Sequence, residues 1–268
     1  MPLSDSSRPR TSSKRDDRPE GQPRVTERSL AACRPLPGRA VRSLAVSAAP
    51  RRPRSMSTDS ARRRRPTAFE LDESKLQPPQ ARPGIVTRTA LVDRLAAAHQ
   101  PVVAITAPAG YGKSTALAQW ADRKRPRVAW LSADDRDNDP VVLLTYLAVA
   151  LDRVEPIPPR VFRSLASPGA GLADVFRLVS AIAAMDGPVH MVVDHAEALT
   201  SPECRDIVAE LAVRLPPGSQ LAIASREQVP VPVPQLRTHG ALLEVDTRDL
   251  AMDDEEGQLL LRGAGTSS

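Results

Sequence analysis

The feature that most constrains this chain is the segment Ala107–Ser114, which reads Ala-Pro-Ala-Gly-Tyr-Gly-Lys-Ser. A β-branched apolar run at 101–106 comes before it, and an amphipathic helical pattern at 115–121 follows it. A buried strand, a glycine loop and a helix that opens with Lys-Ser are the layout of a phosphate-binding loop. The segment therefore predicts a nucleotide site built on an α/β sheet.

Backbone N–H groups and one ammonium group would bind the anion in such a loop. Glycines let the chain turn so that successive N–H groups face a phosphate, and the helix N-terminus adds partial positive charge. Lys113 would reach the β- and γ-phosphates of ATP, and the Ser114 hydroxyl would bind Mg²⁺. The predicted cofactors are therefore ATP and Mg²⁺. The predicted cofactor-binding residues in the loop are Ala109, Gly110, Tyr111, Gly112, Lys113, Ser114 and Thr115.

The first loop position departs from the usual pattern, because Ala107 stands where a glycine is expected. Alanine is disfavoured at positive φ, so we expect Ala107 to keep an ordinary backbone conformation while Gly110 and Gly112 make the turn. The alternative interpretation is a strand-to-helix turn that carries a surface lysine. The apolar strand and the helix on either side favour phosphate binding.

A second nucleotide-site signal is the apolar run at 189–194, which ends in Asp194. At the carboxyl edge of a parallel sheet, this carboxylate would hold Mg²⁺ directly or through water. Ser114 and Asp194 are thus the predicted metal ligands, and Asp194 joins the cofactor-binding set. A further run at 220–225 is followed by Arg226, which would either sense the γ-phosphate or cap the sheet edge.

The sequence divides into four parts. Residues 1–66 form a basic arm rich in Arg, Pro and Ser, and we expect disorder there because so little apolar surface can be buried. Residues 67–100 are an extended lead-in and a first helix, and residues 101–250 are the P-loop nucleotide-binding domain. Residues 251–268 are the truncated start of a following helical segment, whose apolar side has no partner.

Apolar periodicity and turn signals predict alternating strands and helices within these parts. Asn138 or Asp139, directly before Pro140, is the expected start of one helix. The prolines at 156–159 predict a loop. Strands are expected at 101–106, 127–132, 189–194, 220–225 and 241–246, and helices at 89–98, 115–121, 141–151, 172–183, 202–215 and 253–262.

Charge is distributed unevenly along the chain. Residues 1–65 hold 17 Lys+Arg and 6 Asp+Glu, whereas the remainder is mildly acidic. The arginine runs at 51–54 and 62–65 would contact DNA or RNA non-specifically through phosphates, if at all. The alternative is a solvated tail, since no aromatic residue is interleaved for base stacking. A further hypothesis places the true start at Met56, which N-terminal peptide mapping would test.

The two cysteines, Cys33 and Cys204, are too few for a disulfide framework or a cysteine metal site. No stretch approaches the roughly 18 to 20 apolar residues that a membrane span requires. The first residues have no apolar centre of the kind that secretory signals carry. These features predict a cytoplasmic protein that does not contact the membrane.

Several motifs stand in the order found in one family. Over about residues 71–262 the chain resembles the N-terminal ATPase module of large ATP-binding LuxR-type transcriptional regulators. These are the maltose-regulator-like members of the signal-transduction ATPases with numerous domains, the STAND class. The motifs are Lys75-Leu-Gln-Pro-Pro79, the Ala107–Ser114 loop, Leu117-Ala-Gln-Trp120, Val128-Ala-Trp-Leu-Ser132, Asp137-Asn-Asp-Pro140, Val193-Asp194, Ala224-Ser-Arg226 and Leu236-Arg237 through Gly240-Ala-Leu-Leu-Glu244.

The resemblance implies a P-loop NTPase of the ASCE type, with a parallel five-stranded sheet of order 5-1-4-3-2 and helices on both faces. It also implies ATP and ADP as ligands, and self-association in the ATP-bound state. Members of the family continue into sensor and helix-turn-helix domains that this sequence lacks. We therefore interpret the chain as an ATP-binding regulatory module truncated from such a regulator.

ATP hydrolysis is expected to be weak or absent. The resembled family carries two acids after the third strand, whereas here Asp194 is followed by His195, with Glu197 two residues further on. Imidazole lacks the fixed negative charge of a carboxylate, and Glu197 would need a bend in the chain to reach the γ-phosphate. His195, Glu197 and Arg226 are the candidate catalytic residues of what is at most a slow ATPase.

Two other classes of function remain open. A stand-alone P-loop kinase or ATPase would need a lid with arginines, and the sequence between Leu151 and Leu172 offers only Arg153, Arg160 and Arg163. A nucleic-acid-binding protein acting through the basic arm would lose affinity steeply as salt rises.

Overall fold

The computed structural model describes residue 67 and residues 69–80, 84–125 and 127–265. The predicted disorder and nucleic-acid binding of residues 1–66, and the hypothesis of a start at Met56, lie outside these residues. Within them, no helix combines the length and the apolar character that crossing a bilayer requires.

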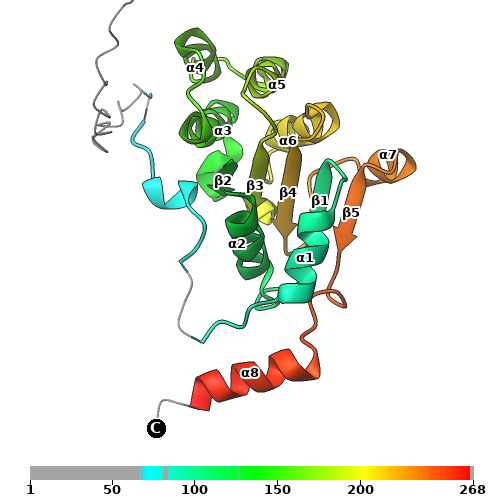
Figure 1. Cartoon of the computed structure of the whole chain (residues 1–268). Helices are drawn as coiled ribbons and strands as arrows, with labels where there is room; N and C mark the ends of the chain where they lie inside the picture. The colour runs from blue at the N-terminus through cyan, green and yellow to red at the C-terminus, as the bar shows by residue number, and fades with distance from the viewer. Residues whose placement is uncertain (1–66, 68, 81–83, 126, 266–268) are drawn as a thin grey trace, which may run out of the picture. The chain divides into compact units, whose positions relative to one another are not determined.

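Five parallel strands form one sheet (Figure 1). Their order is β2-β3-β4-β1-β5, which is the predicted order 5-1-4-3-2 seen from the opposite edge. Every neighbouring pair is parallel, so all carboxyl ends lie at the same edge of the sheet. The strands are β1 (Val102–Thr106), β2 (Val128–Ser132), β3 (His190–Asp194), β4 (Gln220–Ser225) and β5 (Leu242–Val245).

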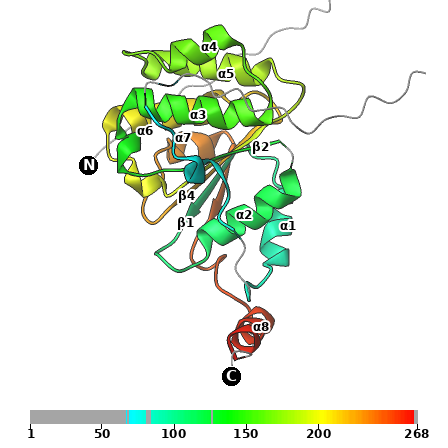
Figure 2. The ribbon, with the colours of Figure 1, turned by 90° about the vertical axis from the view of Figure 1, so that its left-hand side faces the viewer.

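Alternate strand residues enter two separate cores, one on each face of the sheet. In β3, Met191 and Val193 belong to the larger core, whereas Val192 belongs to the smaller one. This is the two-residue period of a strand that is buried on both faces. Helices α1 (Thr89–Ala97) and α2 (Lys113–Lys124) cover the smaller core, and α3 (Pro140–Val154) and α6 (Pro202–Arg214) cover the larger one (Figure 2).

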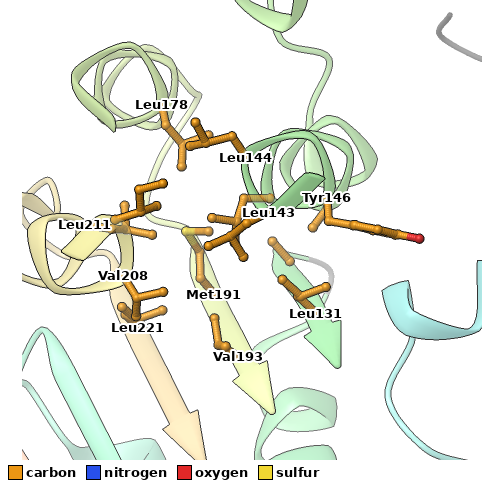
Figure 3. Close-up of a cluster of buried hydrophobic side chains, with 14 of the residues drawn as sticks. Leu131, Leu143, Leu144, Tyr146, Leu178, Met191, Val193, Val208, Leu211 and Leu221 are labelled. Atoms are coloured by element: carbon orange, nitrogen blue, oxygen red, sulfur yellow. The ribbon is translucent and has the colours of Figure 1, made fainter. Parts of the chain in front are cut away.

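Helices α4 (Pro159–Leu165) and α5 (Val175–Ala183) form a further layer over α3. Figure 3 shows Leu178 of α5 directed toward Leu144 of α3, while Leu143 lies on the side of α3 that faces the sheet. Because α3 is packed on both sides, it is apolar around nearly its whole circumference. The other elements are α7 (Val233–Thr238), α8 (Asp254–Gly265), and the short 3₁₀ helices η1 (Glu73–Leu76), η2 (Asp135–Asn138), η3 (Leu172–Asp174) and η4 (Ala196–Ala198).

Two local predictions were wrong, and two short helices were not predicted. The lead-in is not extended throughout, because η1 interrupts it. The predicted loop is present at 156–158, and α4, which was not predicted, begins at its last residue, Pro159; proline is favoured at a first helical position because it has no N–H to leave unpaired. The predicted helix at 172–183 is divided into η3 and α5. Helix α7 was not predicted, because a six-residue helix shows too little periodicity.

Asn138 and Asp139 were alternative predictions for the start of α3, and the structure gives them different roles. Asp139 is the N-cap, and its Oδ1 accepts hydrogen bonds from the N–H groups of Val141 (2.8 Å) and Val142 (3.2 Å). Asn138 instead crosses to the segment after β3, where its Oδ1 accepts from the N–H groups of Thr200 and Ser201, each at 2.7 Å. Asp139 therefore fixes the helix, and Asn138 fixes a loop near the sheet edge.

A buried ion pair joins the lead-in to the β2–α3 connection. Lys75 is 5% exposed and Asp137 is fully buried, with the Lys75 Nζ 2.7 and 2.6 Å from the two carboxylate oxygens. Lys75 Nζ also lies 4.2 Å from the ring centroid of Tyr146 on α3, whose hydroxyl accepts a hydrogen bond from the Asp72 N–H. Burial raises the pKa of Asp137, and the Lys75 ammonium opposes that shift.

Replacing Lys75 by methionine leaves the Asp137 carboxylate buried without its counter-charge. We expect the free energy of unfolding to fall by about 3–5 kcal/mol in urea denaturation. The double variant Lys75→Met, Asp137→Leu should recover part of this loss, because no buried charge remains. Arg123→Met, which breaks the exposed pair with Asp93, is the matched control and should change stability little. An equal loss of stability in Lys75→Met and Arg123→Met would contradict the assignment of Lys75 and Asp137 as a buried ion pair that stabilises the fold.

Candidate functional site

The loop between β1 and α2 owes its shape to two glycines. Gly110 has φ +87° and Gly112, the N-cap of α2, has φ +78°. No atom lies within 4 Å of the position that a Cβ would take at either residue, so the backbone conformation, not crowding, requires glycine. As predicted, Ala107 does not have a positive φ, since His195 is the one non-glycine with positive φ among the described residues. Ala107 is also buried.

The N–H groups of the loop have no internal partners. None of the N–H groups of residues 109–115 donates a hydrogen bond to a residue that the structure describes. The first paired N–H in this stretch is that of Ala116, which donates to the Gly112 carbonyl at 2.8 Å. Unpaired N–H groups are usual at the first turn of a helix, and here they continue back through the glycine loop.

Lys113 folds back over the loop that precedes it. Its Nζ donates hydrogen bonds to the carbonyls of Ala107 (2.6 Å) and Pro108 (2.9 Å), and the residue is 8% exposed. Burial lowers the pKa of Lys113; Glu197 opposes this shift, Arg226 adds to it, and Asp194 opposes it. The charges of three predicted site residues thus act on the loop lysine: Asp194 at the end of β3, Glu197 in η4 and Arg226 directly after β4. The fold therefore brings these residues together.

Asp194 ends β3 with one carboxylate oxygen unpaired. The side chain is 1% exposed to solvent, and its Oδ1 accepts a hydrogen bond from the His195 N–H at 3.0 Å. Its Oδ2 is buried and makes no hydrogen bond within the described residues, and the His195 Nδ1 lies 3.8 Å away. A buried carboxylate oxygen without a partner is costly in a folded protein and marks a group kept for another purpose.

A sharp bend follows Asp194. His195 has φ 58° and ψ 38°, the left-handed region, and η4 begins at the next residue. The bend directs Glu197 to the residue after β4: its Oε1 lies 2.9 Å from the Arg226 Nε, and its Oε2 accepts from the Arg226 N–H at 3.0 Å. Glu197 and Arg226 thus form a pair across the edge of the sheet.

The other predicted loop residues differ in exposure. Tyr111 is 44% exposed, whereas Ser114 and Thr115 are partly buried at the start of α2. The side-chain hydroxyls of Ser114 and Thr115 make no hydrogen bond to any described residue. Metal-binding groups of three or more His, Cys, Asp or Glu residues are absent from the described part of the chain.

Sequence reasoning missed the role of Asn138 in holding this edge. Its Nδ2 donates to the Ala198 carbonyl at 2.7 Å, and its Oδ1 accepts from the two N–H groups that follow η4. The side chain thus fixes the segment that carries Glu197. Its signal was present in the Asp137-Asn-Asp-Pro140 stretch, from which only a helix start and a family resemblance were inferred.

A glycine loop between β1 and α2, together with a carboxylate at the end of β3 and sheet order 5-1-4-3-2, defines the chain as an α/β protein with the P-loop NTPase fold. No protein-family model matches the chain.

Two similar proteins belong to different classes. The chain is 30% identical over 197 residues to the HTH-type transcriptional regulator MalT of Yersinia enterocolitica, a match that covers 70% of this chain and 21% of MalT. It is 32% identical over 202 residues to the serine/threonine-protein kinase PknK of Mycobacterium tuberculosis, covering 72% of this chain and 18% of PknK. The chain therefore contains a MalT-like module and spans about a fifth of the length of these relatives.

A solved structure also overlaps with the chain. It is the Drosophila ORC bound to AT-rich DNA and Cdc6, with 12% sequence identity and a TM-score of 0.39, and the match covers 59% of this chain and 56% of the other. The fold assignment rests on the strand order and the loop geometry described above.

Replacing Asp194 by asparagine removes a buried, incompletely paired charge and keeps an oxygen for the His195 N–H. Because a buried charged group without a partner costs at least about 1–3 kcal/mol, we expect the free energy of unfolding to rise by about 1 kcal/mol. Urea denaturation with EDTA and without nucleotide measures this. Asp137→Asn, at a buried aspartate that is paired with Lys75, is the matched control and should lose stability. A loss of stability in both Asp194→Asn and Asp137→Asn would contradict the finding that the Asp194 Oδ2 has no partner.

Proposed function

We propose that this chain is an ATP-binding regulatory module whose ATP hydrolysis is weak or absent. The observation that carries the proposal is the row of unpaired N–H groups at residues 109–115, in the same loop as the buried Lys113, on which the charges of Asp194 and Glu197 act. Such a row of donors, with one ammonium group, matches the several acceptor oxygens of a triphosphate.

The residues present fit Mg-ATP. The N–H groups of residues 109–115 would bind the phosphates, and Lys113 would exchange its carbonyl partners for β- and γ-phosphate oxygens. Mg²⁺ typically takes one or two carboxylates together with phosphate oxygens and waters. The free Oδ2 of Asp194 and the unpaired hydroxyl of Ser114 are the groups that would hold it. The metal would neutralise phosphate charge.

The relatives support a regulatory module over a complete enzyme or a DNA reader. One is named as a transcriptional regulator and the other as a protein kinase, yet the chain matches only about a fifth of each. A module common to both is better explained by what the two proteins share than by either named activity. We therefore propose a LuxR-type, STAND-class module that acts in the cytoplasm and self-associates when ATP is bound.

Slow hydrolysis follows from the groups beside the proposed γ-phosphate position. His195 stands where a second acid would orient water, and its side chain is 45% exposed. Glu197, the other candidate base, has both oxygens engaged by Arg226. A carboxylate that already accepts two hydrogen bonds, one of them from a guanidinium, is a weaker base for water.

Mg-ATP should stabilise the full chain against heat. At a hundredfold excess over the dissociation constant the gain is about 2.7 kcal/mol, which corresponds to a rise in Tm of about 5–10 °C. In Lys113→Ala the rise should fall to half or less, because a charge-assisted phosphate contact contributes about 1.5–3 kcal/mol. Lys124→Ala, at the other end of α2, should keep the full rise.

A thermal shift that is absent for every purine nucleotide would overturn the proposal. If labelled phosphate passes from ATP to a second small molecule, the stand-alone kinase is the correct class. If affinity for DNA survives removal of residues 1–65, nucleic-acid binding is not a property of the basic arm.

His195→Asp should raise the rate of ATP hydrolysis at least about tenfold, because it adds a fixed negative charge next to Asp194. Aspartate and asparagine both tolerate the left-handed backbone at this position. His195→Asn is therefore the matched control, with a similar shape and no charge, and should not raise the rate. Phosphate release is the measurement. Fast hydrolysis by the unaltered chain, or equal rates in the two variants, would contradict the assigned cause.

A further inference from the structure

Arg226 follows β4 and lies next to the start of the glycine loop. Strands β1 and β4 pair in register, with Thr106 opposite Ser225, and the Ala107 N–H donates to the Ser225 carbonyl at 3.3 Å. The pairing thus continues into the first residue of the loop, and Arg226 comes directly after it. The Arg226 side chain is 57% exposed, and its charge acts on Lys113. A second cation therefore stands beside the loop that carries Lys113.

The guanidinium of Arg226 is engaged at one nitrogen and free at its end. Its Nε lies 2.9 Å from the Glu197 Oε1, and the Arg226 N–H donates to Oε2 of the same carboxylate at 3.0 Å. The two Nη groups make no hydrogen bond to a residue that the structure describes. Arginine carries most of its N–H donors on these two nitrogens. The side chain thus keeps its terminal donors for an anion.

Glu197 directs Arg226 and leaves those terminal donors uncovered. A carboxylate that blocked an anion-binding arginine would take the paired donors that carboxylates and phosphates bind side by side. Here the carboxylate bridges the backbone N–H and the Nε of a single residue, so it restrains the direction of the side chain. An arginine that is already directed loses less conformational entropy when it binds an anion. Glu197 would therefore act on a bound anion through Arg226.

The segment around Glu197 holds the carboxylate in place. The left-handed turn at His195 begins η4, and Asn138 donates to the carbonyl of Ala198 at the other end of η4, at 2.7 Å. The Glu197 side chain is mostly shielded from water. The carboxylate thus has a fixed position from which to direct Arg226.

A module that responds to ATP must bind ATP and ADP with different affinity, because a ligand shifts an equilibrium only by its differential affinity. The N–H groups of the loop would bind phosphates that ADP also carries. We propose that Arg226 binds the γ-phosphate and that Glu197 is its positioning residue, so that this pair gives the chain its preference for ATP over ADP. This inference rests on the proposed function, nucleotide binding at the loop.

Calorimetric titration of the full chain with Mg-ATP and with Mg-ADP tests the proposal. The preference is the Kd for ADP divided by the Kd for ATP. Arg226→Met should lower it about tenfold or more, because a charge-assisted contact is lost. Glu197→Ala should lower it about threefold or more, because the arginine remains but is no longer directed. The double variant should match Arg226→Met alone, since Glu197 acts through Arg226.

Arg237 and Glu244, between α7 and β5, form the matched control pair, with both Nε and Nη2 of the arginine bonded to the carboxylate. Arg237→Met and Glu244→Ala should leave the preference unchanged. ¹H–¹⁵N spectra of the nucleotide-free chain add a readout that needs no ligand. Glu197→Ala should shift the backbone amide signal of Arg226, because that N–H loses its acceptor, and Glu244→Ala should not.

The outcomes separate this inference from the proposed function. A preference that rises in Glu197→Ala would show that the carboxylate competes with the phosphate, and would overturn the proposal. Equal affinity of the unaltered chain for ATP and ADP, or a preference that survives Arg226→Met, would overturn it too. An equal loss of ATP and ADP affinity in Glu197→Ala would assign the carboxylate to the fold alone, against the proposal. Binding of neither nucleotide by the unaltered chain would overturn the proposed function itself.

Discussion

Parallel pairing of β1 with β4, and of β4 with β3, is the constraint on which the rest of this structure depends. It places three strand ends beside one another at one sheet edge: the loop that contains Lys113, the carboxylate of Asp194 and the pair formed by Arg226 with Glu197. No local preference would bring Lys113 to Asp194, which is 81 positions further along the chain. Two separate cores, one on each face, fix this order, because a strand shifted by one residue would turn its buried side chains to the wrong face.

Most of the fold could be predicted, because its signals are local. Apolar runs of five or six residues, each ended by a loop or a polar side chain, gave all five strands to within a residue at either end. The glycine conformations of the loop followed from residue type alone, since Gly110 and Gly112 are the residues that adopt positive φ without strain. The strand order came from a family resemblance, and pairing order is not readable from periodicity.

The parts that escaped prediction depend on contacts between distant residues. The sequence indicated that Glu197 needs a bend, and His195 provides it, but the bend directs the carboxylate to Arg226. Asn138 was one of two candidates for the start of α3; Asp139 is the cap, and Asn138 holds the segment after η4. Lys75 belongs to a motif without an assigned purpose, and its partner Asp137 lies 62 positions away. Such pairings follow from the packed fold and have no period or composition to reveal them.

The central claim is that the N–H groups of the β1–α2 loop bind a triphosphate. ¹H–¹⁵N spectra of the full chain during titration with Mg-ATP test it most directly. The amide signals of Gly110, Gly112 and Lys113 should shift together and saturate at one concentration, because each N–H gains a phosphate acceptor that it lacks within the protein. Saturable ATP binding that leaves these three signals unchanged and shifts others elsewhere would contradict the claim.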